Sequence, residues 1–313
     1  MNLPHLHLLL NHVPTIGTII AVGLLWLALI RKQEGLTRVA LEAFCVVTLV
    51  TLPAYLSGVG TQPIITDMPG VATAAMLRHH DAALVASLVM VVTGFLAWLA
   101  LWKSRRHAGV TKAHLVLVLA MAILTLGLMG RAANIGGEIR HPEMLDPAVE
   151  AVETAEVAED SLTVALANFV NDNPWVWPSL EAMHFVGLWL LFGVVVVVNL
   201  RLLGMLPQAS FAALHRLLPW AALGLCVNLL SGMLFVVAMP GQYVENIAFF
   251  WKIALLLVAG AHLLYLTGFD EPWEVGPGGR VPLRPKALAL VGIVAWVGVM
   301  YYGRMLPFIG NAF

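Results

Sequence analysis

Four long apolar stretches of this chain carry a histidine or a lysine near the same end. His12 opens the first stretch and His79-His80 open the third, while His184 and Lys252 lie just inside the fifth and the seventh. Ionisable groups inside an apolar helix bundle are costly, which makes them candidates for function. Imidazole is the commonest protein ligand of metals, haem iron included. These residues therefore predict a metal or cofactor site at one end of the helices.

The composition identifies the elements that must position this site. Hydrophobic residues make up 60% of the chain and charged residues 11%, against about 25% charged in soluble domains. A membrane-spanning helix needs roughly 20 mostly apolar residues. Eight segments meet this condition, and they predict an all-α polytopic membrane protein with no nucleic-acid partner: 13–31, 39–58, 80–102, 113–131, 178–201, 217–239, 247–267 and 287–306.

Basic residues predict the orientation of these helices. Twelve of the 17 lysines and arginines lie in four connections on one side, 31–38, 103–112, 201–216 and 280–286. Connections rich in Lys and Arg remain in the cytoplasm. Both chain termini, and the histidines near the opposite helix ends, are therefore expected outside the cytoplasm.

The two halves of the chain read as a parallel duplication. Each half begins with a histidine, a glycine and a long apolar run that ends in basic residues. This pattern predicts two tandem four-helix bundles, over 1–131 and 178–313, joined by an extracytoplasmic connection over 132–177. His80 then corresponds to Lys252. The alternative is that two apolar runs look alike without a duplication.

The connection between the halves is acidic. Residues 143–172 predict one or two short helices lying over the outer surface. The negative charges are either a solvated face or a docking surface for a basic partner such as a cytochrome c. His141 lies in a loop before this segment, either exposed to solvent or beside the cofactor.

The histidine spacing suits haem b held by two imidazoles. In an up-down-up-down bundle, helices one and three lie diagonally across the core, so His12 and His80 are the expected axial ligands. His12 as a helix-capping residue and His80 as an interfacial histidine are the alternatives, and His5 and His7 are expected at the surface, before the first helix. Arginines at the same level are the expected propionate partners, and small residues make room for the macrocycle: Arg78, Arg131 and Arg140, with Gly17, Gly58 and Ala83.

The second half lacks a second imidazole opposite His184. The pair of His184 and Lys252 is therefore a degenerate haem site, a quinone contact or an ion pair of Lys252 with a nearby glutamate. Cys45 and Cys226 are the only cysteines, and both lie in apolar segments. No CxxCH or CxxC is present, which excludes covalent c-type haem and the usual thiolate zinc or iron–sulfur sites.

Several motifs carry a family resemblance: LLLNHVPTIG, PAYLSG, HDAA and GGEIRHPE in the first half, and MHFVGLWLLFG, LRLLG, HRLLPWA and FFWKIALLL in the second. The two halves resemble two uncharacterised families of bacterial four-helix membrane domains. Both are similar in layout to cytochrome b561-like and copper-resistance-D-like proteins. The resemblance implies a protein of the bacterial cytoplasmic (inner) membrane. The chain departs from the b561-like pattern because no second histidine pair can be placed.

These observations together predict an integral membrane electron-transfer or anchor subunit. It would bind haem b near the outer face and exchange electrons between quinol and an extracytoplasmic redox partner. No nucleophile constellation, phosphate loop or hydrolytic metal motif indicates a stand-alone enzyme. Two alternatives are a cofactor-free structural subunit of a respiratory or photosynthetic complex, and a copper- or metal-handling membrane protein. The second alternative rests on His5, His7 and His12 and on the 13 methionines.

Overall fold

The structure is a computed structural model, which describes residues 2–66, 68–105, 109–139, 161–274 and 281–309. Every regular element of these residues is a helix, and the bounds are as follows: α1 Leu3–Leu10, α2 His12–Arg31, α3 Glu34–Ile65, α4 Thr73–Ser104, α5 Lys112–Glu138, α7 Leu162–Asp172, α8 Val176–Leu202, α9 Phe211–His215, α10 Leu218–Ala238, α11 Pro240–Val244, α12 Ile247–Gly268 and α13 Leu283–Met305.

The prediction of eight membrane-spanning helices is confirmed for the described part of the chain. Eight helices are long and apolar enough to cross a bilayer, and α1 with α2 counts as one of them. Apolar side chains on their outer faces, such as Ile20, Trp189 and Val294, are exposed. Because a lipid environment stabilises such faces, the chain is a multi-pass membrane protein.

The first span begins earlier than expected, at Leu3 rather than at residue 13. Asn2 is its N-cap, with the side chain accepting a hydrogen bond from the His5 backbone N–H at 3.1 Å, and Pro4 lies in the first turn. Both are common helix-start residues. The expectation that His7 precedes the span was therefore wrong, because the polar residues of α1 lowered the apparent hydropathy.

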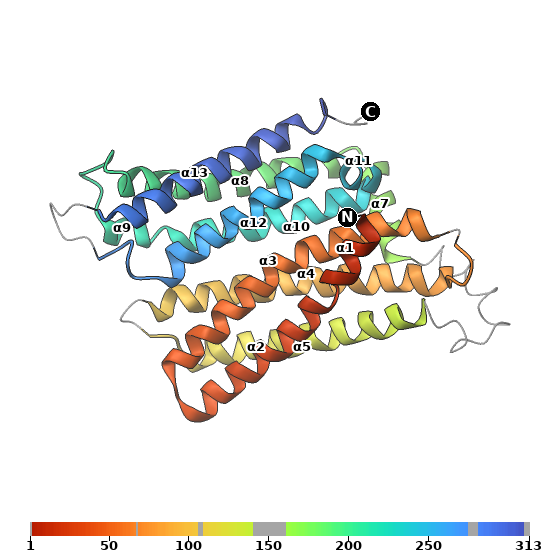
Figure 1. The fold of residues 1–313 in the computed structure, drawn as a ribbon, viewed down its shortest axis with the longest axis horizontal. Helices are drawn as coiled ribbons and strands as arrows, with labels where there is room; N and C mark the ends of the chain where they lie inside the picture. Colours follow the sequence, from red (N-terminus) through yellow and green to blue (C-terminus); the bar gives the residue numbers. More distant parts are fainter. Residues whose placement is uncertain (1, 67, 106–108, 140–160, 275–280, 310–313) are drawn as a thin grey trace.

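The helices pack in two groups, and α3 and α4 lie where the groups meet (Figure 1). In the first group α2, α3, α4 and α5 pack in chain order, α2 also contacts α5, and α1 lies on α3. In the second group α8 packs on α10 and α13, and α12 packs on α13. Helix α4 contacts α10 and α12, and α3 contacts α12. Central helices are the most enclosed: the most apolar windows of α3, α4 and α10 are buried over 67%, 61% and 67%, against 28–33% for the other five spans.

The two ends of the helices are distinct (Figure 1). We call the end that carries α7 and α11 the α7 end, and the opposite end, which carries α9, the α9 end. Both termini lie toward the α7 end in Figure 1. The basic connections fall at the α9 end, which is the cytoplasmic side under the orientation predicted above.

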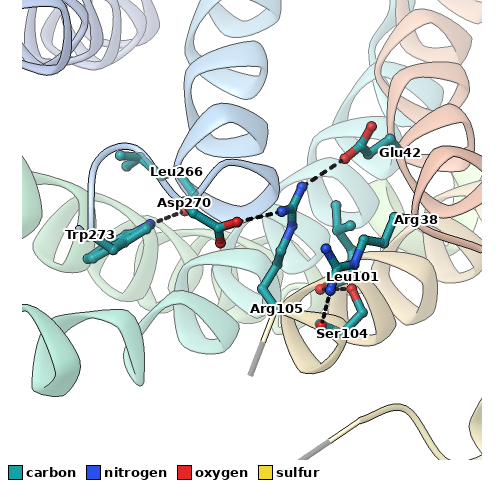
Figure 2. A network of polar contacts seen from close by, with 8 residues as sticks. All are labelled: Arg38, Glu42, Leu101, Ser104, Arg105, Leu266, Asp270 and Trp273. Atoms are coloured by element: carbon teal, nitrogen blue, oxygen red, sulfur yellow. Dashed lines mark hydrogen bonds and ion pairs between the residues drawn. The ribbon is translucent and has the colours of Figure 1, made fainter. Parts of the chain in front are cut away.

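A charged network joins the groups at the α9 end (Figure 2). The Arg105 guanidinium lies 2.9 Å from Asp270 Oδ2 and 3.6 Å from Glu42 Oε1. Arg105 follows α4, Asp270 follows α12 and Glu42 belongs to α3. One cation therefore connects three elements. Deeper in the same interface, Trp98 Nε1 donates to Thr267 Oγ1 at 3.0 Å.

Helix α7 ties the groups together at the other end. It contacts α4, α8 and α10. The Asp81 carboxylate of α4 accepts hydrogen bonds from the backbone N–H groups of Leu162 at 2.9 Å and Thr163 at 2.8 Å, and from the Ser161 hydroxyl at 3.0 Å. A carboxylate at a helix N-terminus satisfies otherwise unpaired N–H groups and opposes the helix dipole. The acidic residues 143–160 lie outside the described residues.

Candidate functional site

A cavity of about 600 Å³ opens at the α7 end of the first group. We call it the first cavity. Its walls come from α1 to α5, and the volume lies within the 300–1,000 Å³ typical of ligand pockets. Small side chains create much of the space, notably Ala54, Gly58, Ala83, Ala86, Ala132, Ala133, Gly136 and Gly137.

His7 extends from α1 into this cavity. Its Nδ1 lies 3.1 Å from the Ala54 carbonyl oxygen and 3.3 Å from Ser57 Oγ. A carbonyl only accepts, so Nδ1 carries the proton, and Nε2 of the neutral ring keeps a free lone pair. A Cβ on Gly58 would lie 2.9 Å from His7 Cε1. Glycine at this position therefore makes room for the imidazole, and it also lines the cavity.

His79 of α4 is held in the same way. Its Nδ1 lies 2.8 Å from the Ala132 carbonyl oxygen of α5, which again makes Nδ1 the donor and leaves Nε2 unprotonated. A Cβ on Gly136 would lie 3.1 Å from both Cε1 and Nδ1 of His79. Each imidazole thus has a carbonyl that fixes its tautomer and a glycine that accommodates its ring.

The rings of His7 and His79 lie edge to face in the cavity. The ring centroids of His7 and His79 are 6.5 Å apart, with an interplanar angle of 74°. With metal–nitrogen bonds of about 2.0–2.1 Å and about 1.1 Å from nitrogen to ring centre, imidazoles on opposite sides of one metal have centres about 6.3 Å apart. Tautomers fixed by backbone carbonyls are also typical of metal-binding histidines. The spacing of the two ring centres is therefore compatible with one metal ion held between them.

His12 and His80, the pair expected from the sequence, do not form a ring contact like that of His7 and His79 within the described residues. His12 lines the first cavity, but it is exposed and makes no ring contact with His80 within the described residues. His80 Nε2 lies 3.4 Å from the Tyr55 hydroxyl. The neighbouring Asp81 caps α7, so its carboxylate does not orient an imidazole. The structure brings together His7 and His79 instead.

Neither of the two described arginines of the expected propionate set, Arg78 and Arg131, lines the first cavity. Arg131 is exposed and is not among the cavity-lining residues. Arg78 lies 3.6 Å from the Glu138 carboxylate. Arg140 and His141 lie outside the described residues. Among these residues, only Arg78 has an ion-pair partner in the described structure, and that partner is Glu138.

His184 and Lys252 line a separate cavity of about 560 Å³ at the same end of the second group. We call it the second cavity. Tyr243 and Glu181 also line it. Burial raises the pKa of Tyr243 to about 12, and the nearby Glu181 carboxylate acts in the same direction. The phenol therefore stays neutral at physiological pH and is available as a hydrogen-bond donor.

The pairing of His7 with His79 in one cavity is a feature that the sequence analysis did not predict. The N-cap Asn2 and Pro4 were the signal that could have placed His7 inside the first span. For His79 the signal was the small-residue face of Ala83 and Ala86, which line the cavity one and two turns further along α4.

Comparison of the chain with family models, curated proteins and solved structures finds no match. The functional proposal below is drawn from the geometry of the site.

Proposed function

We propose that the chain is an integral membrane electron-transfer subunit, which holds one haem b between His7 and His79. The observation that carries this proposal is the pair of neighbouring imidazoles in one cavity, with ring centroids 6.5 Å apart and each Nδ1 bonded to a backbone carbonyl. In this proposal His7 and His79, rather than His12 and His80, would hold the iron. When bound, haem iron supplies exchange of one electron between its ferric and ferrous states.

The chain's own residues supply the binding site. His7 and His79 present unprotonated Nε2 atoms, which is the form that ligates a metal. Gly58 and Gly136 leave room for the rings, and alanines along α3, α4 and α5 leave space between the helices. The apolar walls limit access of water, which is one of the properties that sets the potential of a haem.

The location supports electron exchange at the outer face. Basic connections at the α9 end favour a cytoplasmic position for that end, so the first cavity opens on the extracytoplasmic side of a bacterial cytoplasmic membrane. The subunit would comprise two tandem four-helix units and would pass electrons between quinol and a basic redox partner docked on residues 143–172. The chain would then act within a larger oxidoreductase complex and not as a stand-alone enzyme.

An absorption spectrum of the purified, dithionite-reduced protein tests the proposal. The wild type, produced in a haem-replete host, is expected to show the Soret and α bands of a b-type haem. His7→Ala and His79→Ala should each lose most of the α band, whereas His12→Ala should keep it.

His12→Ala is a matched control, because His12 lines the same cavity as His7 and lies on the same span. Loss of the α band in His12→Ala and His80→Ala, with His7→Ala unaffected, would restore the pair expected from sequence alone. A wild-type protein without a Soret band would favour a cofactor-free structural subunit.

A further inference from the structure

The second cavity has a different chemical character from the first. Its walls are mostly apolar and aromatic, with Trp177, Phe185, Phe235 and Phe249 among them. No second imidazole faces His184 among the described lining residues. An apolar cavity with a few polar groups is typical of a site for a small, largely hydrophobic ligand.

Three polar groups of this cavity carry the argument. His184 Nδ1 lies 2.8 Å from Ser231 Oγ, whose own proton is donated to the Val227 carbonyl at 2.7 Å. His184 Nδ1 is therefore the donor, and Nε2 of the neutral ring is an acceptor without a partner in the described structure. Trp296 lines the cavity and is 1% exposed, and its buried Nε1–H has no hydrogen-bond partner among the described residues.

Lys252 is the third group. It lines the cavity, and no carboxylate lies within ion-pair distance of its Nζ in the part of the chain that the structure describes. Gly303 of α13 lies beside this ammonium, since a Cβ there would be 3.5 Å from Nζ. An ammonium and an indole N–H without partners are both costly in an apolar site, and a ligand that accepts hydrogen bonds would satisfy them.

We propose that the second cavity binds the head ring of a membrane quinone or quinol. Ring carbonyl or hydroxyl oxygens would accept from Lys252 and Trp296, and a quinol hydroxyl would donate to His184 Nε2. Aromatic walls suit a flat ring.

The cavity also has an approach from the lipid side. Phe185 lines it and is 51% exposed on the outer face of α8. A ligand dissolved in the bilayer can therefore enter beside α8 with its apolar tail left among the lipids.

Helix α3 separates the two cavities. Thr51, Ala54 and Tyr55 line the first cavity, whereas Leu52 and Leu56 line the second. One helix with side chains is about 10–12 Å across, so occupants of the two cavities would lie about one helix apart. The quinol role of this site rests on the proposed haem function, but the binding itself does not depend on haem.

Equilibrium binding of decylubiquinone to the full-length protein in detergent tests the site, with quenching of tryptophan fluorescence as the readout. Lys252→Met and Trp296→Phe are each expected to raise Kd about tenfold, the size of one hydrogen bond, and His184→Leu should do the same for the reduced quinol. Lys286→Met, which changes the lysine at the α9 end of α13, should keep the wild-type Kd.

Wild-type Kd values in both Lys252→Met and Trp296→Phe would overturn the proposal. Binding of decanoate in place of decylubiquinone, lost in Lys252→Met, would also overturn it and assign the cavity to anionic amphiphiles. The reduced α band separates the two proposals. Quinone binding with no haem in the wild type would refute only the haem function, and an intact α band without quinone binding would refute only this site.

Discussion

Each imidazole of the first cavity has one nitrogen bonded to a backbone carbonyl and the other free. His7 and His79 come from different helices, yet both show this arrangement, with a glycine packed against the ring one turn after the bonded carbonyl, on the same helix as that carbonyl. In the described structure neither Nε2 atom has a partner, and both rings line the first cavity, where a donor or a metal could reach them. These two available nitrogens in one cavity are the residue-scale basis of the haem proposal.

Gly136→Ala tests the fit of His79. The new Cβ would lie 3.1 Å from the ring, so the imidazole must shift by a few tenths of an ångström. We expect haem affinity to fall about tenfold because metal–ligand geometry tolerates little displacement. Titration of haem into the apoprotein, followed at the Soret band, measures this change.

Gly130→Ala is the matched control, since it lies on the same helix and its Cβ would meet nothing within 4 Å. Replacing a helical glycine with alanine stabilises a helix by about 0.5–1 kcal/mol. The control should therefore keep its haem affinity with an unchanged or higher melting temperature. Equal haem loss in both variants would indicate a backbone effect and would contradict the role given to Gly136.

At the scale of elements, the short helix α7 connects the two helix groups. It contacts both groups, with its N-terminus bound by Asp81 and the side chain of Asn171 near its other end donating to the Ala238 carbonyl at 2.9 Å. Asp81 follows His79 and His80 directly on α4. The docking of α7 is therefore coupled to the part of α4 that carries the candidate site.

Asp81→Ala is expected to release α7. The change removes the acceptor for several N–H and O–H groups and should cost about 1–3 kcal/mol, as for buried polar groups left unsatisfied. Hydrogen–deuterium exchange of residues 162–172 should rise sharply. Asp172→Ala, at the opposite end of the same helix, should leave exchange near its N-terminus unchanged. Slow exchange in Asp81→Ala would show that apolar contacts alone hold α7.

For the whole molecule, the two cavities and the basic connections lie at opposite ends of the helices. Both cavities open at the α7 end, and the Arg105 network and the basic connections lie at the α9 end (Figure 2). The membrane orientation therefore decides which compartment both proposed sites face.

Cysteine labelling tests this orientation in cells. In a background with Cys45→Ala and Cys226→Ala, an impermeant maleimide added to spheroplasts should label Asn173→Cys at the α7 end and spare Met205→Cys at the α9 end. Both positions are exposed, and the positive-inside rule supplies the direction. After lysis both should react equally. Labelling of Met205→Cys alone in intact spheroplasts would place both cavities on the cytoplasmic side.

The sequence by itself determined the membrane class and the eight spans, because runs of apolar residues long enough to cross a bilayer leave few alternatives. It also selected the third and first spans as carriers of histidine chemistry. Only the tertiary structure decided which histidines face one another. On α4, His79 and His80 are adjacent and point about 100° apart around the helix, so the choice between them depends on where α5 packs. His7 became a candidate only once α1 lay on α3, because no local pattern records the Ala54 carbonyl or the space at Gly58.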